Sequence, residues 1–182
     1  MKNYKLLFVL LTCSVLFFSC DKIKTDVKIS SLSIEMDNIS VTSAAKGVSG
    51  DAINFFSATK TISLDDVQGV TDEALRFRNK IESIEVGTTT SVTVTSTDDA
   101  GTVIKEFVLN ANGLSNAINI PQYDLGTAYS GNLQNFVIEL LTTLFKSNSV
   151  TMNTSGKTDI TSGETLKVKI TITNIILTTG LF

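Results

Sequence analysis

The stretch Leu166–Thr173, LKVKITIT, alternates strictly between apolar and polar side chains. Leucine, valine and isoleucine occupy its even-numbered positions, and lysine and threonine occupy its odd-numbered positions. This two-residue period places every apolar side chain on one face of an extended strand. A strand with one buried face and one solvated face is typical of an antiparallel sheet. The stretch therefore predicts a mainly β fold.

Strand patterns recur on the N-terminal side of this stretch. Val27–Met36 also alternates, but its apolar positions change phase at Ser30–Ser31, which predicts a β-bulge there. Ile53–Leu64 has strand character as well. Thr89–Leu109 is predicted to form a hairpin, because two strand-like arms flank the turn residues Asp98–Gly101.

Two segments follow a helical period instead. In Asn132–Lys146, seven apolar side chains recur at intervals of three and four residues and form one stripe. Ser130 or Asn132 is predicted to cap the start of this helix. A short helix is predicted within Asp65–Lys80, with Thr71 as its N-cap. The long stripe indicates a helix packed on a sheet, although a helix that covers a lipid pocket or touches a membrane would carry the same pattern.

Together these segments predict the fold class: mainly β, an antiparallel β-sandwich-like domain with one long amphipathic helix and one short helix. The chain has 182 residues, a length that suits one domain. Residues 27–182 are predicted to be this single β-rich domain.

The composition excludes several functions. The chain contains no histidine, so it has no Ser-His-Asp or Cys-His catalytic unit and no imidazole ligand for zinc. Its formal net charge of −3 and its pI of about 4.9 argue against nucleic acid, which is bound by basic surfaces. No glycine-rich phosphate loop and no nicotinamide, flavin or haem signature is present, so we expect no cofactor.

The paired carboxylates have structural explanations. Asp65–Asp66 precedes the predicted short helix, Asp72–Glu73 lies in its first turn, and Asp98–Asp99 lies in a predicted turn. Capping, the helix dipole and turn chemistry account for acids at these places. None of the pairs has the spacing of a calcium loop. We therefore predict no metal site and no enzymatic activity, with hydrolysis by two distant carboxylates as the enzymatic alternative.

Residues 1–19 have the pattern of a secretory signal peptide. Lys2 and Lys5 precede the apolar run Leu6–Phe18, which ends just before Cys20. A membrane-spanning helix needs about 20 apolar residues, so this run is too short to act as one. An ordinary signal peptide followed by a coincidental cysteine is the alternative interpretation.

The sequence Leu16–Cys20, LFFSC, resembles a bacterial lipobox, in which a small residue precedes a cysteine that becomes lipidated. Phe17 stands where leucine is usual, and this relaxed form is similar to that of Bacteroidetes-type envelope lipoproteins. The resemblance implies that Cys20 is diacylated, with residues 20–26 as the lipidated cysteine and a tether. It also implies an outer-membrane lipid anchor, with surface exposure favoured over a periplasm-facing position. Cys13 lies inside the signal, so Cys20 would be the only cysteine of the mature chain.

One loop region offers candidate binding residues. Tyr123 and Tyr129 flank a turn-like segment, and Gln122 and Asn119 lie close by in the sequence. Aromatic and amide side chains in a loop are typical of a contact surface. Tyrosines at the rim of the core are the alternative interpretation.

These observations predict a non-catalytic cell-envelope lipoprotein that presents a β-rich binding, adhesion or scaffold domain. Its partners would be the membrane, through the lipid anchor, and a glycan, an envelope protein or a host surface molecule. The alternative is a lipid-binding or envelope-assembly lipoprotein with a pocket between helix 132–146 and the sheet.

Overall fold

The computed structural model describes residues 24–43, 53–97 and 103–180. Of these residues, 59% lie in strands and 18% in helices, which confirms the prediction of a mainly β protein. Every strand pair is antiparallel. Cys20 and the turn Asp98–Gly101 lie outside the described residues.

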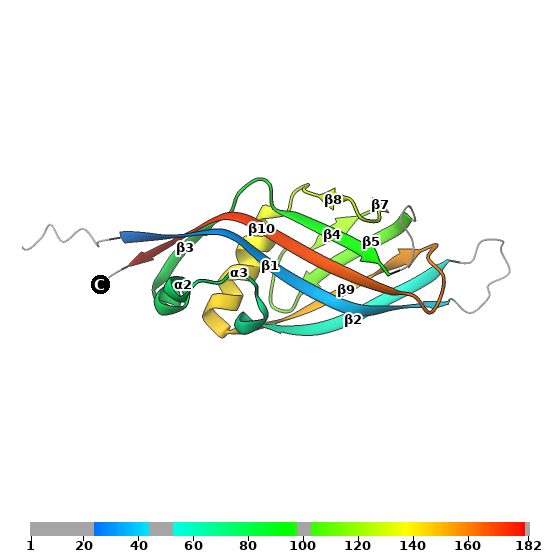
Figure 1. The fold of residues 1–182 in the computed structure, drawn as a ribbon, viewed down its shortest axis with the longest axis horizontal. Helices are drawn as coiled ribbons and strands as arrows, with labels where there is room; N and C mark the ends of the chain where they lie inside the picture. Colours follow the sequence, from blue (N-terminus) through cyan, green and yellow to red (C-terminus); the bar gives the residue numbers. More distant parts are fainter. Residues whose placement is uncertain (1–23, 44–52, 98–102, 181–182) are drawn as a thin grey trace, which may run out of the picture.

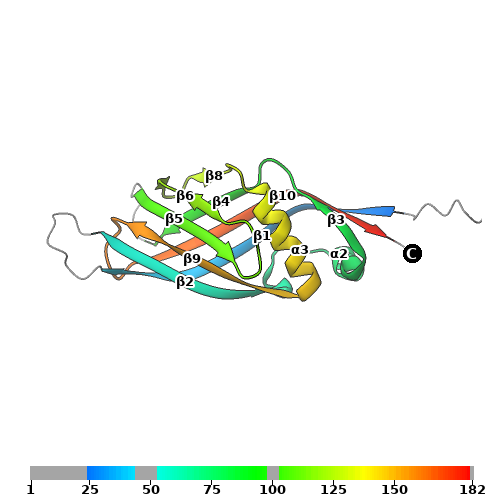
Figure 2. The same cartoon turned by 180° about the vertical axis from the view of Figure 1, so that it is seen from behind.

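The described strands form one continuous sheet in the order β6-β5-β9-β2-β1-β10-β4-β8, with β3 added to β10 and β7 added to β5. This sheet curls, so that β2, β9 and β5 lie behind β1, β10 and β4 (Figures 1 and 2). The sequence predicted a sandwich-like pair of layers, whereas hydrogen bonds join both layers into one sheet. The strands are β1 (Lys24–Ser43), β2 (Asn54–Ser63), β3 (Ile81–Glu85), β4 (Ser91–Ser96), β5 (Val103–Ala111), β6 (Ile118–Ile120), β7 (Tyr123–Asp124), β8 (Ala128–Tyr129), β9 (Ser149–Thr158) and β10 (Thr165–Gly180).

Strand β1 connects the two layers. It pairs with β10 along most of its length, from Lys24 to Ser40. It pairs with β2 only at its end, where Val41–Ser43 lies opposite Asn54–Phe56. The two strands diverge beyond that short contact, which leaves a seam between β1 and β2. Because β1 begins at Lys24, the last three residues of the predicted tether belong to a strand.

The alternation that predicted β10 is confirmed, because its even-numbered apolar residues from Leu166 to Ile172 are all buried. The predicted bulge at Ser30–Ser31 is in the wrong place. The apolar positions of β1 and of β10 change phase at the same point of their pairing. Ile29 therefore still lies opposite Ile175, and neither strand carries an extra residue there. The register shift lies between Met36 and Ile39, where Asn38 has a φ of 57°.

The predicted hairpin over Thr89–Leu109 is wrong. β4 pairs with β10 and β8, whereas β5 pairs with β9, β6 and β7. Both segments are strands, but they belong to opposite layers of the curled sheet. Local alternation fixes the buried face of a strand and not its neighbour, and here each arm pairs with a long C-terminal strand instead.

The helical region near the C-terminus is α3 (Gln134–Ser147). Its buried side chains include Phe136, Leu140 and Leu144, which lie on one side of the helix. The predicted cap is wrong, because Leu133 occupies the N-cap position and makes no side-chain hydrogen bond.

The short helix is α2 (Asp72–Phe77), flanked by the 3₁₀ turns η1 (Leu64–Asp66) and η2 (Arg78–Lys80). The predicted N-cap is confirmed: Oγ1 of Thr71 accepts a hydrogen bond from the amide of Ala74 at 3.2 Å.

The core lies between the two layers and against α3. Its large buried side chains come from β2 (Phe56), β5 (Phe107), α3 (Phe136 and Phe145) and β10 (Ile170). The rings of Phe56 and Phe107 lie 6.4 Å apart in a tilted arrangement. Each fully buried side chain of this size contributes about 1.5–3 kcal/mol to the stability of the fold.

Candidate functional site

The structure gives the four predicted binding residues different degrees of exposure. The side chain of Tyr123 is only 3% exposed. Its hydroxyl accepts a hydrogen bond from the amide of Val94 at 2.9 Å and donates one to the carbonyl of Thr127. Its ring packs 6.3 Å from that of Phe107. Tyr123 is therefore a core residue that contacts both layers, and it is not accessible as a binding residue.

The other three predicted residues remain accessible to different degrees. Tyr129 is half-buried on the edge strand β8, opposite Val92. Gln122 and Asn119 are exposed. Asn119 lies on β6 opposite Val108, so it shares the outer face of the layer formed by β2, β9, β5 and β6.

We call this outer surface the neutral face. Strand register and burial place its residues in rows across the layer, with hydroxyl and amide groups in most positions. Its members are Phe55, Ser57, Thr59, Thr61, Glu106, Val108, Asn110, Asn112, Asn119, Thr151, Asn153, Ser155 and Lys157. The two charged members neutralise each other, since Nζ of Lys157 lies 2.5 Å from Oε2 of Glu106. Cross-strand pairs of this kind also stabilise the sheet.

A chain of side-chain hydrogen bonds orients the amides of the neutral face. Thr59 donates to Oδ1 of Asn153 at 2.8 Å. Nδ2 of Asn153 donates to Oδ1 of Asn110 at 3.1 Å and to Oδ1 of Asn112 at 3.0 Å. An amide that accepts through its oxygen still has two N–H donors. Within the described part of the chain, Nδ2 of Asn110 and of Asn112 has no acceptor, so both groups offer oriented donors to an external ligand.

A shallow depression adjoins this network. It has a volume of about 350 Å³ and its lining includes Lys105, Val108, Asn119 and Pro121. It forms because β5 shifts register between Ile104 and Glu106 and because proline ends the short strand β6. Ligand pockets usually have volumes of about 300–1,000 Å³, so the depression is large enough for a small ligand group.

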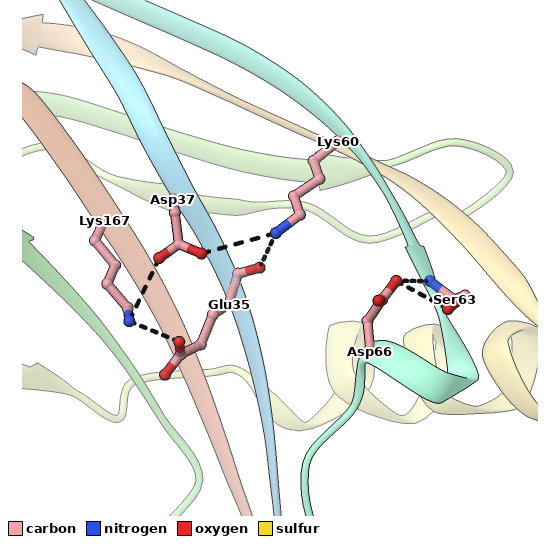
Figure 3. A network of polar contacts seen from close by, with 6 residues as sticks. All are labelled: Glu35, Asp37, Lys60, Ser63, Asp66 and Lys167. Atoms are coloured by element: carbon pink, nitrogen blue, oxygen red, sulfur yellow. Dashed lines mark hydrogen bonds and ion pairs between the residues drawn. The ribbon is translucent and has the colours of Figure 1, made fainter.

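The outer surface of the other layer carries an ionic cluster, which we call the charged face (Figure 3). Glu35 on β1 lies between two lysines of β10: its carboxylate is 2.6 Å from Nζ of Lys167 and 3.4 Å from Nζ of Lys169. Asp37 lies 3.3 Å from Lys167 and 3.8 Å from Lys60. The hydrogen bond from Lys167 holds the pKa of Glu35 below its ordinary value, and the same bond raises the pKa of Lys167.

Lys60 reaches this cluster from β2. Its ammonium donates to the backbone carbonyl of Glu35 at 3.1 Å, and so it spans the seam between β1 and β2 (Figure 3). Every charge in the cluster has a partner of opposite sign. This arrangement is that of a structural network rather than of a site that awaits a ligand.

The acids considered for catalysis that lie within the described residues occupy structural positions. Asp65 is exposed, and the carboxylate of Asp66 accepts hydrogen bonds from both the amide and the hydroxyl of Ser63 at 2.8 Å (Figure 3). The bond from the Ser63 amide lowers the pKa of Asp66. Asp98–Asp99 lies outside the described residues. In residues 24–43, 53–97 and 103–180, no three metal-ligating side chains gather into a metal site.

Glu139 is an acid with several hydrogen-bond donors around its carboxylate, and the sequence did not identify it as a candidate site residue. Its carboxylate accepts hydrogen bonds from the amides of Ser115 and Asn116, at 2.9 and 3.1 Å, and from the side chain of Asn116 at 2.7 Å. These bonds, led by that of the Asn116 amide, lower the pKa of Glu139. Glu139 thus fixes the loop before β6 to α3. The two segments are distant in the sequence and no local pattern links them, so this contact could not be predicted from the sequence.

No protein-family model matches the chain, and neither a curated protein nor a solved structure matches it. Among the described residues, no helix is long and apolar enough to span a membrane.

Proposed function

We propose that this protein is a non-catalytic cell-envelope lipoprotein that presents a β-rich binding domain. In this proposal Cys20 carries the lipid anchor, and the curled sheet, closed in a sandwich-like manner by the long amphipathic helix, exposes the neutral face to a partner. The main support is the neutral face itself, where oriented amide donors and a depression of about 350 Å³ share one exposed surface.

The direction of β1 supports presentation of this face away from a membrane. β1 begins four residues after Cys20 and reaches its contact with β2 at Val41. Its 17 steps from Lys24 to Val41 span about 55 Å at the usual strand rise. The first part of β1 lies at one end of the elongated molecule, whereas β2, β9 and β5 lie toward the other (Figure 1). An anchor at Cys20 would therefore hold the neutral face well away from the bilayer.

The packing of α3 gives less support to the alternative of a lipid pocket. Four apolar side chains on its inner side, those of Val137, Leu140, Leu141 and Leu144, are each 0% exposed. The cavity lined by α3 and β3 residues has a volume of about 30 Å³. That is close to the space of one water molecule, far less than an acyl chain needs.

The anchor is tested by fractionation of cells that produce the Cys20→Ala variant. Two or more acyl chains give stable anchoring, so the wild type is expected in the membrane pellet and the variant in the soluble fraction. A serine-to-alanine change at Ser14, inside the signal, is the matched control and is expected to leave the wild-type distribution unchanged. A Cys20→Ala protein that still pellets with membranes would contradict the proposal.

The orientation is tested by protease treatment of intact cells, with a periplasmic protein as the control for leakage. We expect digestion of the wild-type domain, because the proposal places it on the outer surface. Protection of the domain while a known surface protein is cleaved would place it in the periplasm. That result would contradict surface presentation and would favour an envelope-assembly role.

A further inference from the structure

We infer that the ligand of the neutral face is a neutral glycan, bound through the free amide donors of Asn110 and Asn112. This inference rests on the proposed function, because it names the partner of the same binding domain. Three properties of the neutral face support it: its charge, its hydrogen-bonding groups and its shape.

Charge excludes strongly ionic ligands from this face. Among the described residues that form this face, two are charged, Glu106 and Lys157, and they form an ion pair with each other. Lys105 adds one positive charge at the rim of the depression. A polyanion would be bound by a cluster of cations, and a polycation by a cluster of anions. The neutral face offers neither, and so it suits an uncharged ligand.

The hydrogen-bonding groups match the hydroxyl groups of a sugar. The network through Asn153 fixes the amide oxygens of Asn110 and Asn112, so their N–H donors have a set orientation before any ligand arrives. Sugar hydroxyl and ring oxygens accept from such donors. The hydroxyl of Ser57 can accept or donate in return, and that of Thr59, which donates to Asn153, can accept. Preorganised donors lose little side-chain entropy on binding, which favours the complex.

A peptide fits this face less well than a sugar. Peptides that add to a sheet use unpaired backbone groups at an edge, but β9, which carries Asn153, is paired with β2 and β5 on both sides. The strand at the edge of the sheet, β6, spans only Ile118–Ile120 and gives a peptide few backbone groups to pair with. Peptides that dock by side chains need apolar pockets. Apart from Phe55 and Val108, the neutral face is polar.

Phe55 completes the site for an extended glycan. Its side chain is 41% exposed, which leaves an aromatic ring available to stack on the apolar face of a sugar. Phe55 lies four residues from Thr59 along β2, a separation of about 13 Å in a strand. A ligand that contacts both the ring and the amides is therefore an oligosaccharide rather than a single sugar. The depression beside Asn119 lies in the neighbouring strands, β5 and β6.

The inference is tested by native affinity electrophoresis of the full-length protein in detergent. Gels contain a β-glucan, an α-glucan, a mannan or a xylan, and one gel contains anionic polygalacturonate. At least one neutral polymer is expected to retard the wild type, whereas polygalacturonate is not. The Asn110→Asp/Asn112→Asp variant keeps the oxygens that accept from Asn153 but loses the free donors. Its affinity is expected to fall about tenfold or more, since two hydrogen bonds are lost.

The control variant Asn79→Asp/Asn174→Asp adds the same charge at two exposed asparagines outside the neutral face and is expected to bind like the wild type. Phe55→Ala is expected to weaken binding without changing the circular dichroism spectrum. Retardation by no neutral polymer, retardation by polygalacturonate alone, or equal binding of the Asn110→Asp/Asn112→Asp variant would each overturn the inference. The proposed function is judged separately, by fractionation and protease treatment. If the Cys20→Ala protein is soluble and protease digests the wild-type domain on intact cells, the proposed function stands even when the glycan inference fails. If the Cys20→Ala protein stays in the membrane pellet, the proposed function is contradicted whatever the gels show.

Discussion

The charged face and the neutral face are two outer surfaces of the same curled sheet, and they use their side chains differently. On the charged face, Glu35 and Asp37 each contact lysine ammonium groups, and every charge of this cluster is paired. On the neutral face, Thr59 and Asn153 direct hydrogen bonds toward amide oxygens and leave amide N–H groups that have no acceptor among the described residues. The first surface is satisfied within the protein, whereas the second retains donors.

This difference has a physical basis in the chemistry of the side chains. An ion pair is complete when two charges meet, and its strength depends on salt and on pH. An amide carries an acceptor and two donors, so a chain of amides that bond through their oxygens ends in free donors. Two surfaces with the same backbone geometry can therefore differ in chemistry: one is satisfied within the protein, and the other is the surface that we propose binds a partner.

The largest loss of stability is expected from a substitution that forces apart β9 and β5, two strands of the neutral face. A Cβ atom on Gly156 would lie 2.0 Å from the carbonyl oxygen of Glu106 and 2.5 Å from the ring of Phe56. Gly156→Ala is therefore expected to lower the free energy of unfolding by about 3 kcal/mol, as overpacking does. Urea denaturation measures this change. Ser155→Ala, at the exposed neighbouring position, is the control and should change stability by less than about 0.5 kcal/mol. Equal stability of Gly156→Ala and wild type would show that β5 and β9 can separate at little cost.

The next effect tests whether the charged face depends on salt. Glu35→Gln removes the carboxylate that contacts Lys167 and Lys169. Exposed pairs are worth about 0.2–1 kcal/mol, so we expect a loss in this range in urea denaturation at low salt. The loss should shrink in 1 M NaCl, where charges are screened within about 3 Å. A loss that stays constant between low and high salt would mean that packing, not charge, explains the contribution of Glu35.

A smaller difference is expected in the dependence of stability on pH. The folded pKa of Glu35 is below its ordinary value of 4.5, so its contribution is complete above that pH and is lost as the pH falls through the folded pKa. Thermal unfolding between pH 6 and pH 3 should therefore show a steeper acid decline for the wild type than for Glu35→Gln. Asp66 and Glu139 have lowered pKa values in both proteins, so some decline should remain in the variant. Parallel curves for the two proteins would rule out the contribution of Glu35.

The smallest effect is expected on the neutral face. Thr59→Val removes the hydroxyl that donates to Asn153 but keeps a β-branched side chain of nearly the same shape. We expect a loss of about 0.5 kcal/mol, because exposed hydrogen bonds contribute little net stability. Unlike the loss in Glu35→Gln, it should be the same at low and high salt. A salt-dependent loss here would remove the distinction between the two faces.

Local patterns in the sequence predicted individual elements well. The alternation in Leu166–Thr173 predicted a strand with one buried face, and Thr71 was recognised as an N-cap from its place before two acids. The alternation in β4 and β5 also predicted strands, but it led to the wrong pairing between them. Asn119 was chosen for its loop position, and the structure places it on an exposed strand at the edge of the neutral face.

The neutral face itself could not be predicted from the sequence. Thr59, Asn110 and Asn153 are far apart in the chain, and they meet because β2 and β5 both pair with β9. A shift of register by one residue would have turned these side chains into the core. Tyr123 illustrates the same limit: its burial depends on contacts with Val94 and Phe107, from the two layers, that no local pattern encodes.

The sequence by itself determined the class of structure, the buried face of the long alternating strands and the absence of imidazole chemistry, because periodicity and composition are local properties. It also supplied the signal and lipobox pattern on which the proposed envelope location rests. Only the tertiary structure decided which strands are neighbours, where the sheet curls and which polar side chains meet. Those outcomes depend on long-range pairing, in which each strand is placed by the apolar surface that the whole fold can bury.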